Sequence, residues 1–383
     1  MKRVGGLWDR LTAFDNLYLA YRKARRGKGA RLEVALFDAQ LEKHLFALQA
    51  ELLEGRYQPG DYRLFTVYER KPRQIAAAPF RDRVVHHALM NLLEPAIDPR
   101  FIFDSYACRK GKGVHRAVAR YQHWAQRHRY ALKLDISRYF PSVDHAILKG
   151  QLRRYIKDAA VLDLLDRIID GGPATNPPPR YFSGDDLWTP VERRVGIPIG
   201  NLTSQFFANL YLNGLDHFIK ERLQAPAYLR YVDDMILLAD DKAQLWAWRE
   251  AIVAELETLR LLMHPKKCHL APTCDGLDVL GYRVFPGHRL LRNDNGHRFA
   301  RKLSGMARAY AAGRYEFADF RPSIQSWIGH ASQADTLGLR KAIFGAVSFA
   351  RDRAERQPAR ESRGFVEQQW QQDAFRQPQQ QHP

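Results

Sequence analysis

The stretch that decides the fold is Leu229-Arg230-Tyr231-Val232-Asp233-Asp234-Met235-Ile236-Leu237-Leu238-Ala239. Its two apolar arms are rich in Tyr, Val, Ile and Leu, a composition typical of β-strands. The arms flank an acidic pair, which predicts a hairpin with Asp233 and Asp234 at its two-residue turn. Two carboxylates so close repel each other, and one takes up a proton unless a cation lies between them. An isolated Asp-Asp pair is most often an acidic surface turn, so the interpretation depends on a third carboxylate.

The third carboxylate is Asp135, in the run Ala131-Leu132-Lys133-Leu134-Asp135-Ile136-Ser137-Arg138-Tyr139-Phe140-Pro141-Ser142. Apolar residues alternate there with Lys133 and Asp135, which predicts a strand with Asp135 at its end. Ser142 is a candidate cap for a helix that begins near Asp144. Together with the acidic pair, Asp135 completes the ligands of a two-metal site. In such a site two ions roughly 4 Å apart clamp the attacking and leaving oxygens of a phosphoryl transfer.

The two acidic motifs, Tyr231-Val232-Asp233-Asp234 and Asp135-Ile136-Ser137-Arg138-Tyr139-Phe140, resemble the catalytic motifs of reverse transcriptases. The resemblance covers roughly residues 30 to 345 and keeps the order of the family's motifs. It implies an α+β right-hand polymerase with fingers, a palm made of an antiparallel sheet packed on helices, and a helical thumb. It also implies two Mg²⁺ ions, with Mn²⁺ as a substitute, held by the three aspartates and the backbone of Ile136.

Length and charge agree with several subdomains and a polyanionic partner. The 383 residues exceed what one core usually serves. Sixty Lys and Arg against 42 Asp and Glu give a net charge of +18, which favours nucleic acid through steering and counterion release. A membrane is not expected, because no apolar run of about eighteen residues and no signal-peptide core is found. Three scattered cysteines fit a reducing interior, so we expect a cytoplasmic protein. The resemblance implies that it is bacterial or phage-encoded.

Four parts are expected along the chain. They are an N-terminal helical extension with a basic run (1–55), a fingers and palm reverse transcriptase domain (56–288), a helical thumb (289–350), and a disordered tail rich in Arg, Gln and Pro (351–383). No carboxylate constellation for a ribonuclease H and no nuclease pattern follows the palm. We therefore expect a bare polymerase.

Basic residues supply the expected contacts to nucleotide and nucleic acid. Residues 61–83 predict a strand pair with a cationic turn, and bidentate Arg with point-charge Lys suits a triphosphate. By resemblance, the residues that grip the incoming nucleotide are Arg70, Lys71 and Arg73. The nucleic-acid contacts that the resemblance implies, the last two in a primer-grip-like hairpin, are Arg81, Arg83, Arg109, Lys110, Lys112, Tyr231, Gly281 and Tyr282.

Two further positions near the nucleotide follow from the resemblance. Phe140 acts as a steric gate that closes on the sugar where a 2′-hydroxyl would project; ordinary packing beneath the site is the alternative. Lys267 lies near the leaving pyrophosphate, where it donates a proton or neutralises charge; a plain surface lysine is equally compatible.

The run Ile199-Gly200-Asn201-Leu202-Thr203-Ser204-Gln205 carries the most specific resemblance. It reads as a loop leading into a helix, and Ile199, Gly200 and Gln205 are its candidate nucleotide contacts. Many reverse transcriptases carry Gln where this chain has Ile199. The run instead resembles the reverse transcriptases of diversity-generating retroelements, which copy a template RNA with errors at adenine so that the cDNA replaces part of a target gene.

That resemblance implies a set of partners. They are template RNA, the RNA/cDNA duplex, deoxynucleoside triphosphates and a small, basic, helical accessory protein that assembles as a ring. Three alternatives stay open. One is another small bacterial reverse transcriptase, from a retron, a defence system or a group II intron; another is an RNA-binding protein on a decayed palm. The third is an RNA-dependent RNA polymerase, which Phe140 disfavours.

Overall fold

The computed structural model describes residues 3–68, 72–173 and 178–351, in which helices predominate and strands form three sheets. The tail expected to be disordered, 351–383, lies outside the described residues except for its first residue. None of the described helices is long and apolar enough to cross a bilayer.

The chain forms two compact units. The N-terminal unit comprises residues 1–113 and 132–270, and the C-terminal unit comprises residues 114–131 and 271–383. A short piece from the middle of the chain therefore packs with the C-terminal part. The expected boundaries between fingers, palm and thumb stay a prediction, because compactness alone does not test them.

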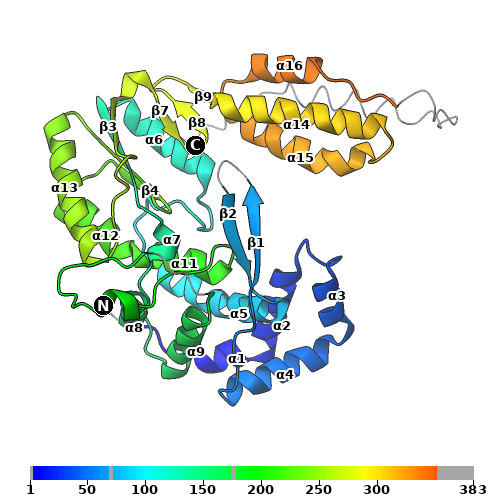
Figure 1. Ribbon diagram of the computed structural model, residues 1–383, viewed down its shortest axis with the longest axis vertical. Helices are drawn as coiled ribbons and strands as arrows, with labels where there is room; N and C mark the ends of the chain where they lie inside the picture. The colour runs from blue at the N-terminus through cyan, green and yellow to red at the C-terminus, as the bar shows by residue number, and fades with distance from the viewer. Residues whose placement is uncertain (1–2, 69–71, 174–177, 352–383) are drawn as a thin grey trace. The chain divides into compact units, whose positions relative to one another are not determined.

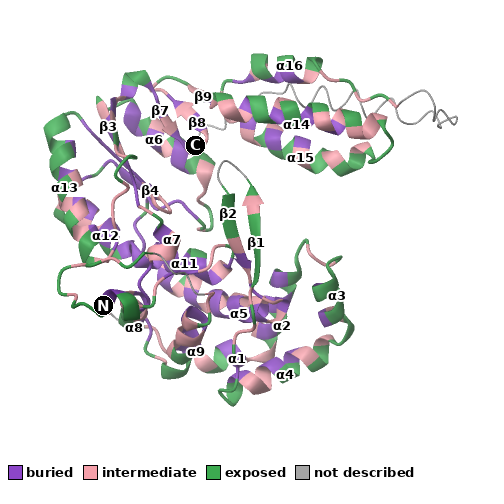
Figure 2. Ribbon diagram, viewed as in Figure 1, coloured by how far each residue is buried: buried purple, intermediate pink, exposed green. Residues whose placement is uncertain are grey.

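The N-terminal unit begins with a cluster of helices (Figure 1). Their bounds are α1 (Trp8–Thr12), α2 (Phe14–Arg25), α3 (Leu32–Ala39), α4 (Leu41–Leu53) and α5 (Phe80–Ile97), which a 3₁₀ turn (Asp98–Arg100) follows. α5 packs against α1, α2 and α3, and Figure 2 shows it largely buried. Val85, Leu89 and Leu93 recur on it at helical spacing and are all buried. This helix is the centre on which the others pack.

A two-stranded hairpin connects α4 to α5. It pairs β1 (Arg63–Tyr68) antiparallel with β2 (Pro72–Ala77), with Phe65 opposite Ile75. The predicted strand pair is confirmed, while its basic turn lies outside the described residues. β1 is exposed along almost its whole length (Figure 2), so the hairpin has little core of its own.

The four-stranded sheet of this unit has the order β4-β5-β3-β6. Its strands are β3 (Tyr130–Asp135), β4 (Tyr228–Tyr231), β5 (Asp234–Ala239) and β6 (His269–Pro272). β4 and β5 are antiparallel and nearly fully buried, which confirms the apolar arms of the hairpin.

The turn of that hairpin differs from the prediction by one residue. Tyr231 pairs with Asp234, so the two turn residues are Val232 and Asp233, and Asp234 begins β5. Val232 has a φ of 58°, a conformation that a β-branched residue adopts at a cost. The sequence could not indicate this, because Val is a residue of strands and Asp is a residue of turns.

Helices surround this sheet. They are α7 (Tyr139–Ser142), α8 (His145–Tyr155), α9 (Ala159–Asp170), α10 (Thr189–Glu192), α11 (Leu202–Tyr211), α12 (Asn213–His217) and α13 (Lys242–Thr258), with a π-helical turn at Phe218–Arg222. The cap of α8 is Asp144, whose side chain accepts a hydrogen bond from the Ile147 amide at 3.1 Å. The prediction of Ser142 as the cap is therefore wrong, because Ser142 ends α7 and Asp144 is the last residue before α8.

The C-terminal unit contains one helix from mid-chain and the end of the chain. Its elements are α6 (Val114–Ala125), β7 (Leu277–Val279), β8 (Tyr282–Val284), β9 (Arg289–Leu291), α14 (Asn293–Ala311), α15 (Phe317–Ala331) and α16 (Leu337–Gly345), with a 3₁₀ turn at Thr273–Asp275. β8 is the middle strand of the three, and both its neighbours are antiparallel to it. Phe299 of α14 stacks on Trp327 of α15 with ring centroids 3.9 Å apart, which holds these two helices together.

Candidate active site

Three carboxylates meet at the end of the four-stranded sheet. Asp135 is the last residue of β3, Asp233 lies on the hairpin turn and Asp234 opens β5. Burial, then the charges of Asp135 and Asp234, raise the pKa of Asp233 to about 6. Charges must lie close together to shift a pKa in this way. The fold therefore brings the three aspartates together, as the sequence predicts.

Two lysines supply countercharge to this cluster. Lys267 forms an ion pair with Asp135, and the Lys133 ammonium lies 3.4 Å from Asp234. The chain near Lys267 is fixed to β3, because the His264 amide donates to the Asp135 carbonyl at 2.7 Å. Lys267 therefore lies at the acidic cluster while its side chain stays 49% exposed, and its role near the pyrophosphate stays a prediction. Lys133 was not predicted, although its alternation with Asp135 on one strand face was the available signal.

The donors suit a hard divalent cation. Carboxylate oxygens are the ligands that Mg²⁺ prefers, and a cation at this cluster would offset the burial and the neighbouring charges that raise the pKa of Asp233. In the described part of the chain, no group of three or more His, Cys, Asp or Glu side chains is arranged so that it could hold a metal ion by itself. Mg²⁺ commonly takes one or two carboxylates and completes its shell with substrate phosphates and water. Such an ion would stabilise the oxygens of a phosphoryl transfer at this point.

A buried arginine fixes the hairpin turn from behind. The Arg230 guanidinium donates to the Val232 carbonyl at 3.0 Å and to Asp216 of α12 at 2.6 Å. It also donates to the Asn209 side chain of α11 at 3.3 Å, and the Tyr228 hydroxyl donates to Asp216 at 2.7 Å. The turn that carries Asp233 is thus hydrogen-bonded, through one side chain, to two helices.

The Arg230–Asp216 pair is completely buried, with both side chains 0% exposed. Burial would lower the pKa of Arg230, but the Asp216 carboxylate outweighs burial and raises the pKa above its usual value. Sequence reasoning missed both residues, since an Arg between strand residues and an Asp on a helix are common on surfaces. The only signal was a charge at Arg230 inside an otherwise apolar strand.

The Gly200 loop, which we define as residues 196–201, lies against the β1–β2 hairpin. The Ala76 amide of β2 donates to the Ile199 carbonyl at 3.0 Å. Gly200 has a φ of 121°, and a Cβ there would lie 2.9 Å from the Ile75 side chain. Glycine is required at this position for both reasons. The loop leads into α11, on which Gln205 is exposed.

The same loop is also bonded to the turn after β3. The Ile197 amide donates to the Phe140 carbonyl at 3.0 Å, and Phe140 is half-buried on α7. The Tyr139 and Phe140 rings meet edge to face with centroids 5.7 Å apart. A half-buried ring in the turn after β3 is compatible with both the gate and the packing alternatives.

The basic residues expected to contact the triphosphate and template have different surroundings. Arg70 and Lys71 lie outside the described residues, and Arg73 is exposed on β2. Arg81 pairs with Glu51, and Arg83 pairs with Glu33 at 2.9 Å. Both lie in the first turn of α5, and each is already engaged with a carboxylate.

The loop of residues 105–113 gives a correction. The Arg109 guanidinium is 7% exposed, pairs with Asp98 at 2.6 Å and donates to three carbonyls, so it holds the loop together rather than reaching a nucleic acid. Lys112 is half-buried and donates to the Phe103 carbonyl at 2.7 Å, while Lys110 is exposed. Lys110 is the residue of the three that best keeps its predicted role.

The primer-grip-like segment gives a second correction. Tyr282 is fully buried, and its hydroxyl contacts both Nδ1 and the carbonyl oxygen of His330 on α15 at 2.8 Å. It therefore belongs to the core of the C-terminal unit and is not a nucleic-acid contact. Gly281 precedes it with a φ of 97°, and a Cβ there would approach His330. Tyr231 is half-buried on β4, where its predicted contact stays a prediction.

A family model described as reverse transcriptase (RNA-dependent DNA polymerase) matches residues 66–284, more than half of the chain. The chain belongs to this family. The matched region contains all three aspartates, the Gly200 loop, the second half of β1 and all of β2. The right-hand polymerase class predicted for this reverse transcriptase is confirmed.

Curated relatives agree with this assignment. The reverse transcriptase is 28% identical to protein YkfC of Escherichia coli (strain K12) over 297 residues, which cover 67% of this chain and 74% of YkfC. It is 26% identical to the group II intron-encoded protein LtrA of Lactococcus lactis subsp. cremoris over 211 residues. That match covers 54% of this chain and 33% of LtrA, so the chain spans about a third of LtrA's length.

A solved structure was also matched. The apo telomerase of Candida tropicalis, truncated from its C-terminal domain, aligns with a TM-score of 0.43 and 12% identity. The alignment covers 61% of the reverse transcriptase and 55% of the telomerase chain.

Proposed function

We propose that this reverse transcriptase copies a template RNA into error-prone cDNA for a diversity-generating retroelement. The observation that carries the proposal is the run Ile199–Gln205, in which an apolar residue stands where many family members have Gln. Its position supports the proposal, because the Ile199 carbonyl is bonded to β2 and the same loop is bonded to the Phe140 carbonyl in the turn that follows β3 and Asp135. A residue so placed can influence how a nucleotide lies over the carboxylates.

The proposed chemistry uses two Mg²⁺ ions at Asp135, Asp233 and Asp234. When substrate and Mg²⁺ bind, the ions would replace Lys133 and Lys267 as the partners of the carboxylates. Lys267 would then lie near the leaving pyrophosphate. Its substrates are deoxynucleoside triphosphates and an RNA template. A small, basic, ring-forming accessory protein is the further partner of this proposal.

A second candidate is a reverse transcriptase of group II intron descent outside any diversity-generating element. The identity to YkfC and to LtrA favours it. The two candidates make different cDNA. Faithful copying of adenine would favour group II intron descent, whereas errors concentrated opposite adenine would favour the retroelement.

Replacement of Phe140 with Ala tests the gate. If the ring closes on the sugar, Phe140→Ala should raise the use of ribonucleotides relative to deoxynucleotides by about 10- to 100-fold, because a steric clash with the 2′-hydroxyl disappears. The measurement is the ratio of kcat/KM for the two sugars. Phe140→Tyr, which keeps the bulk, is the matched control and should keep the parent ratio. An unchanged ratio in Phe140→Ala would assign the ring to packing.

Replacement of Ile199 with Gln tests the origin of errors. A Gln amide can hydrogen-bond near the incoming sugar and restrain its pose, whereas Ile has no donor or acceptor. When the nucleotide is held loosely, the correct pair loses the most rate, because small misplacements slow the reaction. The difference in transition-state free energy between a correct pair and a mispair should therefore shrink by about 1–2 kcal/mol. We expect Ile199→Gln to lower the errors opposite adenine about 5- to 30-fold.

The readout is the sequence of cDNA copied from one template by both proteins. Ile199→Leu, which adds no polar group, is the control and should stay error-prone. Accurate copying of adenine by the parent enzyme would refute the retroelement proposal. Error-prone copying by Ile199→Gln as well would refute the mechanism and leave the retroelement proposal standing.

A further inference from the structure

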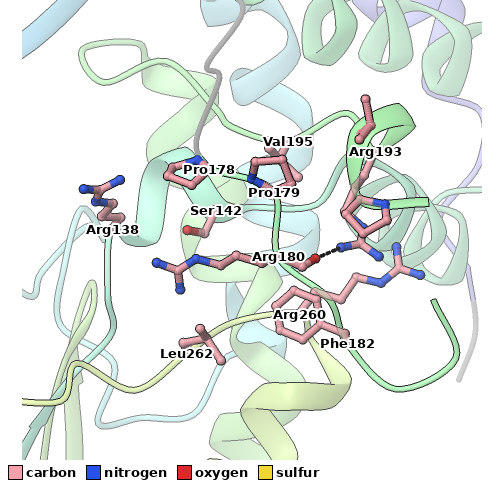
Figure 3. Close-up of a pocket in the computed structure, with 12 residues that line it drawn as sticks. Arg138, Ser142, Pro178, Pro179, Arg180, Phe182, Arg193, Val195, Arg260 and Leu262 are labelled. Carbon is pink, nitrogen blue, oxygen red and sulfur yellow. Dashed lines mark hydrogen bonds between the residues drawn. The ribbon is translucent and has the colours of Figure 1, made fainter. Parts of the chain in front are cut away.

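A cavity of about 450 Å³ lies in the N-terminal unit beside the turn after β3 (Figure 3). Three separate segments form its walls: the turn that carries Arg138 and Ser142, the described insertion 178–195, and the chain at Arg260 after α13. The insertion has no part in the acidic cluster, so the cavity needs an explanation of its own.

The insertion is fixed in place by buried ionic contacts. The Arg193 side chain is 7% exposed, pairs with Asp185 and donates to the Arg180 carbonyl at 3.0 Å, the contact drawn in Figure 3. Arg260 pairs with the buried Asp144 at 2.7 Å. Two of the four arginines that line the cavity are thus neutralised and form a firm wall.

The other two arginines leave the cavity with excess positive charge. Arg138 and Arg180 have no carboxylate partner among the residues that the structure describes, and no Asp or Glu is among the described residues that line the cavity. Figure 3 shows both guanidinium groups on the side of the cavity where the Ser142 hydroxyl lies. Two guanidinium groups and a hydroxyl are the donors that bind phosphate oxygens.

The rest of the wall is apolar. It consists of Pro178, Pro179, Phe182, Pro190, Val191, Val195 and Leu262. Such a wall excludes water and strengthens a charged contact at its edge. It also offers surface to a sugar or an unstacked base, which is how proteins hold single-stranded RNA. The volume lies within the range of pockets that hold small ligands.

We propose that this cavity binds a phosphate group of single-stranded RNA, with Arg138, Arg180 and Ser142 as the donors. The net charge of +18 brings the strand to the surface, and the cavity gives it a fixed anchoring point whose described lining contains no carboxylate. The proposal needs RNA binding by this chain but not DNA synthesis, so it rests on the proposed function only for the identity of the polymer. A free nucleotide carries the same phosphate chemistry, and the test separates the two sources.

The test measures binding of the full-length chain to labelled oligouridine across a salt series. Arg180→Ala should weaken binding about tenfold, and the log–log salt slope should fall by about 0.7, the value for one phosphate contact to a single strand. Arg180→Lys keeps the charge and should keep the slope while losing part of the affinity. The matched control is Arg194→Ala, a charge loss in the same insertion at a side chain that is 70% exposed and outside this cavity.

Two results would overturn the proposal. One is an Arg180→Ala protein that binds oligouridine as Arg194→Ala does, with the same slope. The other is an unchanged RNA affinity with a raised KM for deoxynucleoside triphosphates, which would assign the phosphate to a free nucleotide. Thermal unfolding of each variant checks folding, and the half-buried Arg180 side chain should leave the Tm unchanged.

Discussion

Asp233→Asn is expected to abolish DNA synthesis and to stabilise the metal-free protein at neutral pH. Loss of a carboxylate that holds the ions removes charge stabilisation of several kcal/mol from the transition state, a rate loss of about 1,000-fold or more. Primer extension with Mg²⁺ as the only metal measures this loss. Oligouridine binding should stay near the parent value, since the turn carries no RNA contact in this account.

The gain in stability follows from the pKa of Asp233, which is about 6 in the folded chain against an ordinary value of 3.8. A raised acid pKa means that the folded state binds this proton more tightly than the unfolded state. Folding stability is therefore lost as pH rises from about 4 to about 6, and it stays lost above that. At pH 7 the uncharged Asn should restore about 2 kcal/mol, after allowance for solvent screening.

Chemical denaturation in EDTA at pH 7 and at pH 4 measures this effect. The advantage of Asp233→Asn over the parent should be present at pH 7 and nearly absent at pH 4. The matched control is Asp61→Asn, an exposed position shortly before β1, which should alter neither synthesis nor stability. Near-normal extension by Asp233→Asn would show that Asp233 is not part of the proposed metal site. A variant less stable than the parent at pH 7 would show that the ionised Asp233 carboxylate does not destabilise the folded state.

Arg230→Met should destabilise the fold by about 3–5 kcal/mol. The substitution leaves Asp216 as a buried carboxylate without its cation, and breaking such a pair is far more costly than losing an exposed one. The free energy of unfolding from urea titration is the measurement. Arg222→Met, at an exposed arginine of the neighbouring π-helical turn, is the control and should change it by less than about 0.5 kcal/mol.

A double-mutant cycle separates stability from positioning. Asp216→Asn in the Arg230→Met background removes the stranded charge and should recover part of the lost stability. Synthesis should not recover with it, because the hydrogen bond from Arg230 to the Val232 carbonyl is still missing. Equal recovery of both quantities would mean that the arginine stabilises the fold without positioning the turn.

The positions of the three aspartates could be predicted because each lies in a local pattern of neighbouring residues that indicates a strand end or a hairpin. Alternation places Asp135 at a strand end on the face opposite the apolar residues, and an acidic pair between two apolar arms indicates a hairpin. The turn itself was misplaced by one residue, since the tertiary contacts of Arg230 hold Val232 in a conformation that its side chain disfavours. Local preference was overruled there by a buried ion pair.

Roles that depend on tertiary burial could not be predicted in this way. Tyr282 and Arg109 have the residue types of nucleic-acid contacts, but the first is packed against His330 and the second against Asp98. Whether an aromatic or a guanidinium faces solvent depends on which helix covers it. The sequence of a strand or loop does not contain that information.

The conformation of Val232 has a consequence for laboratory evolution. A positive φ at a β-branched residue costs on the order of 1–3 kcal/mol, which Gly or Asn would largely avoid. Selection of a library for heat resistance alone should therefore enrich Gly or Asn at position 232. A turn with Gly or Asn at position 232 should fix the position of Asp233 less firmly. The heat-resistant variants should therefore be slower polymerases than the parent.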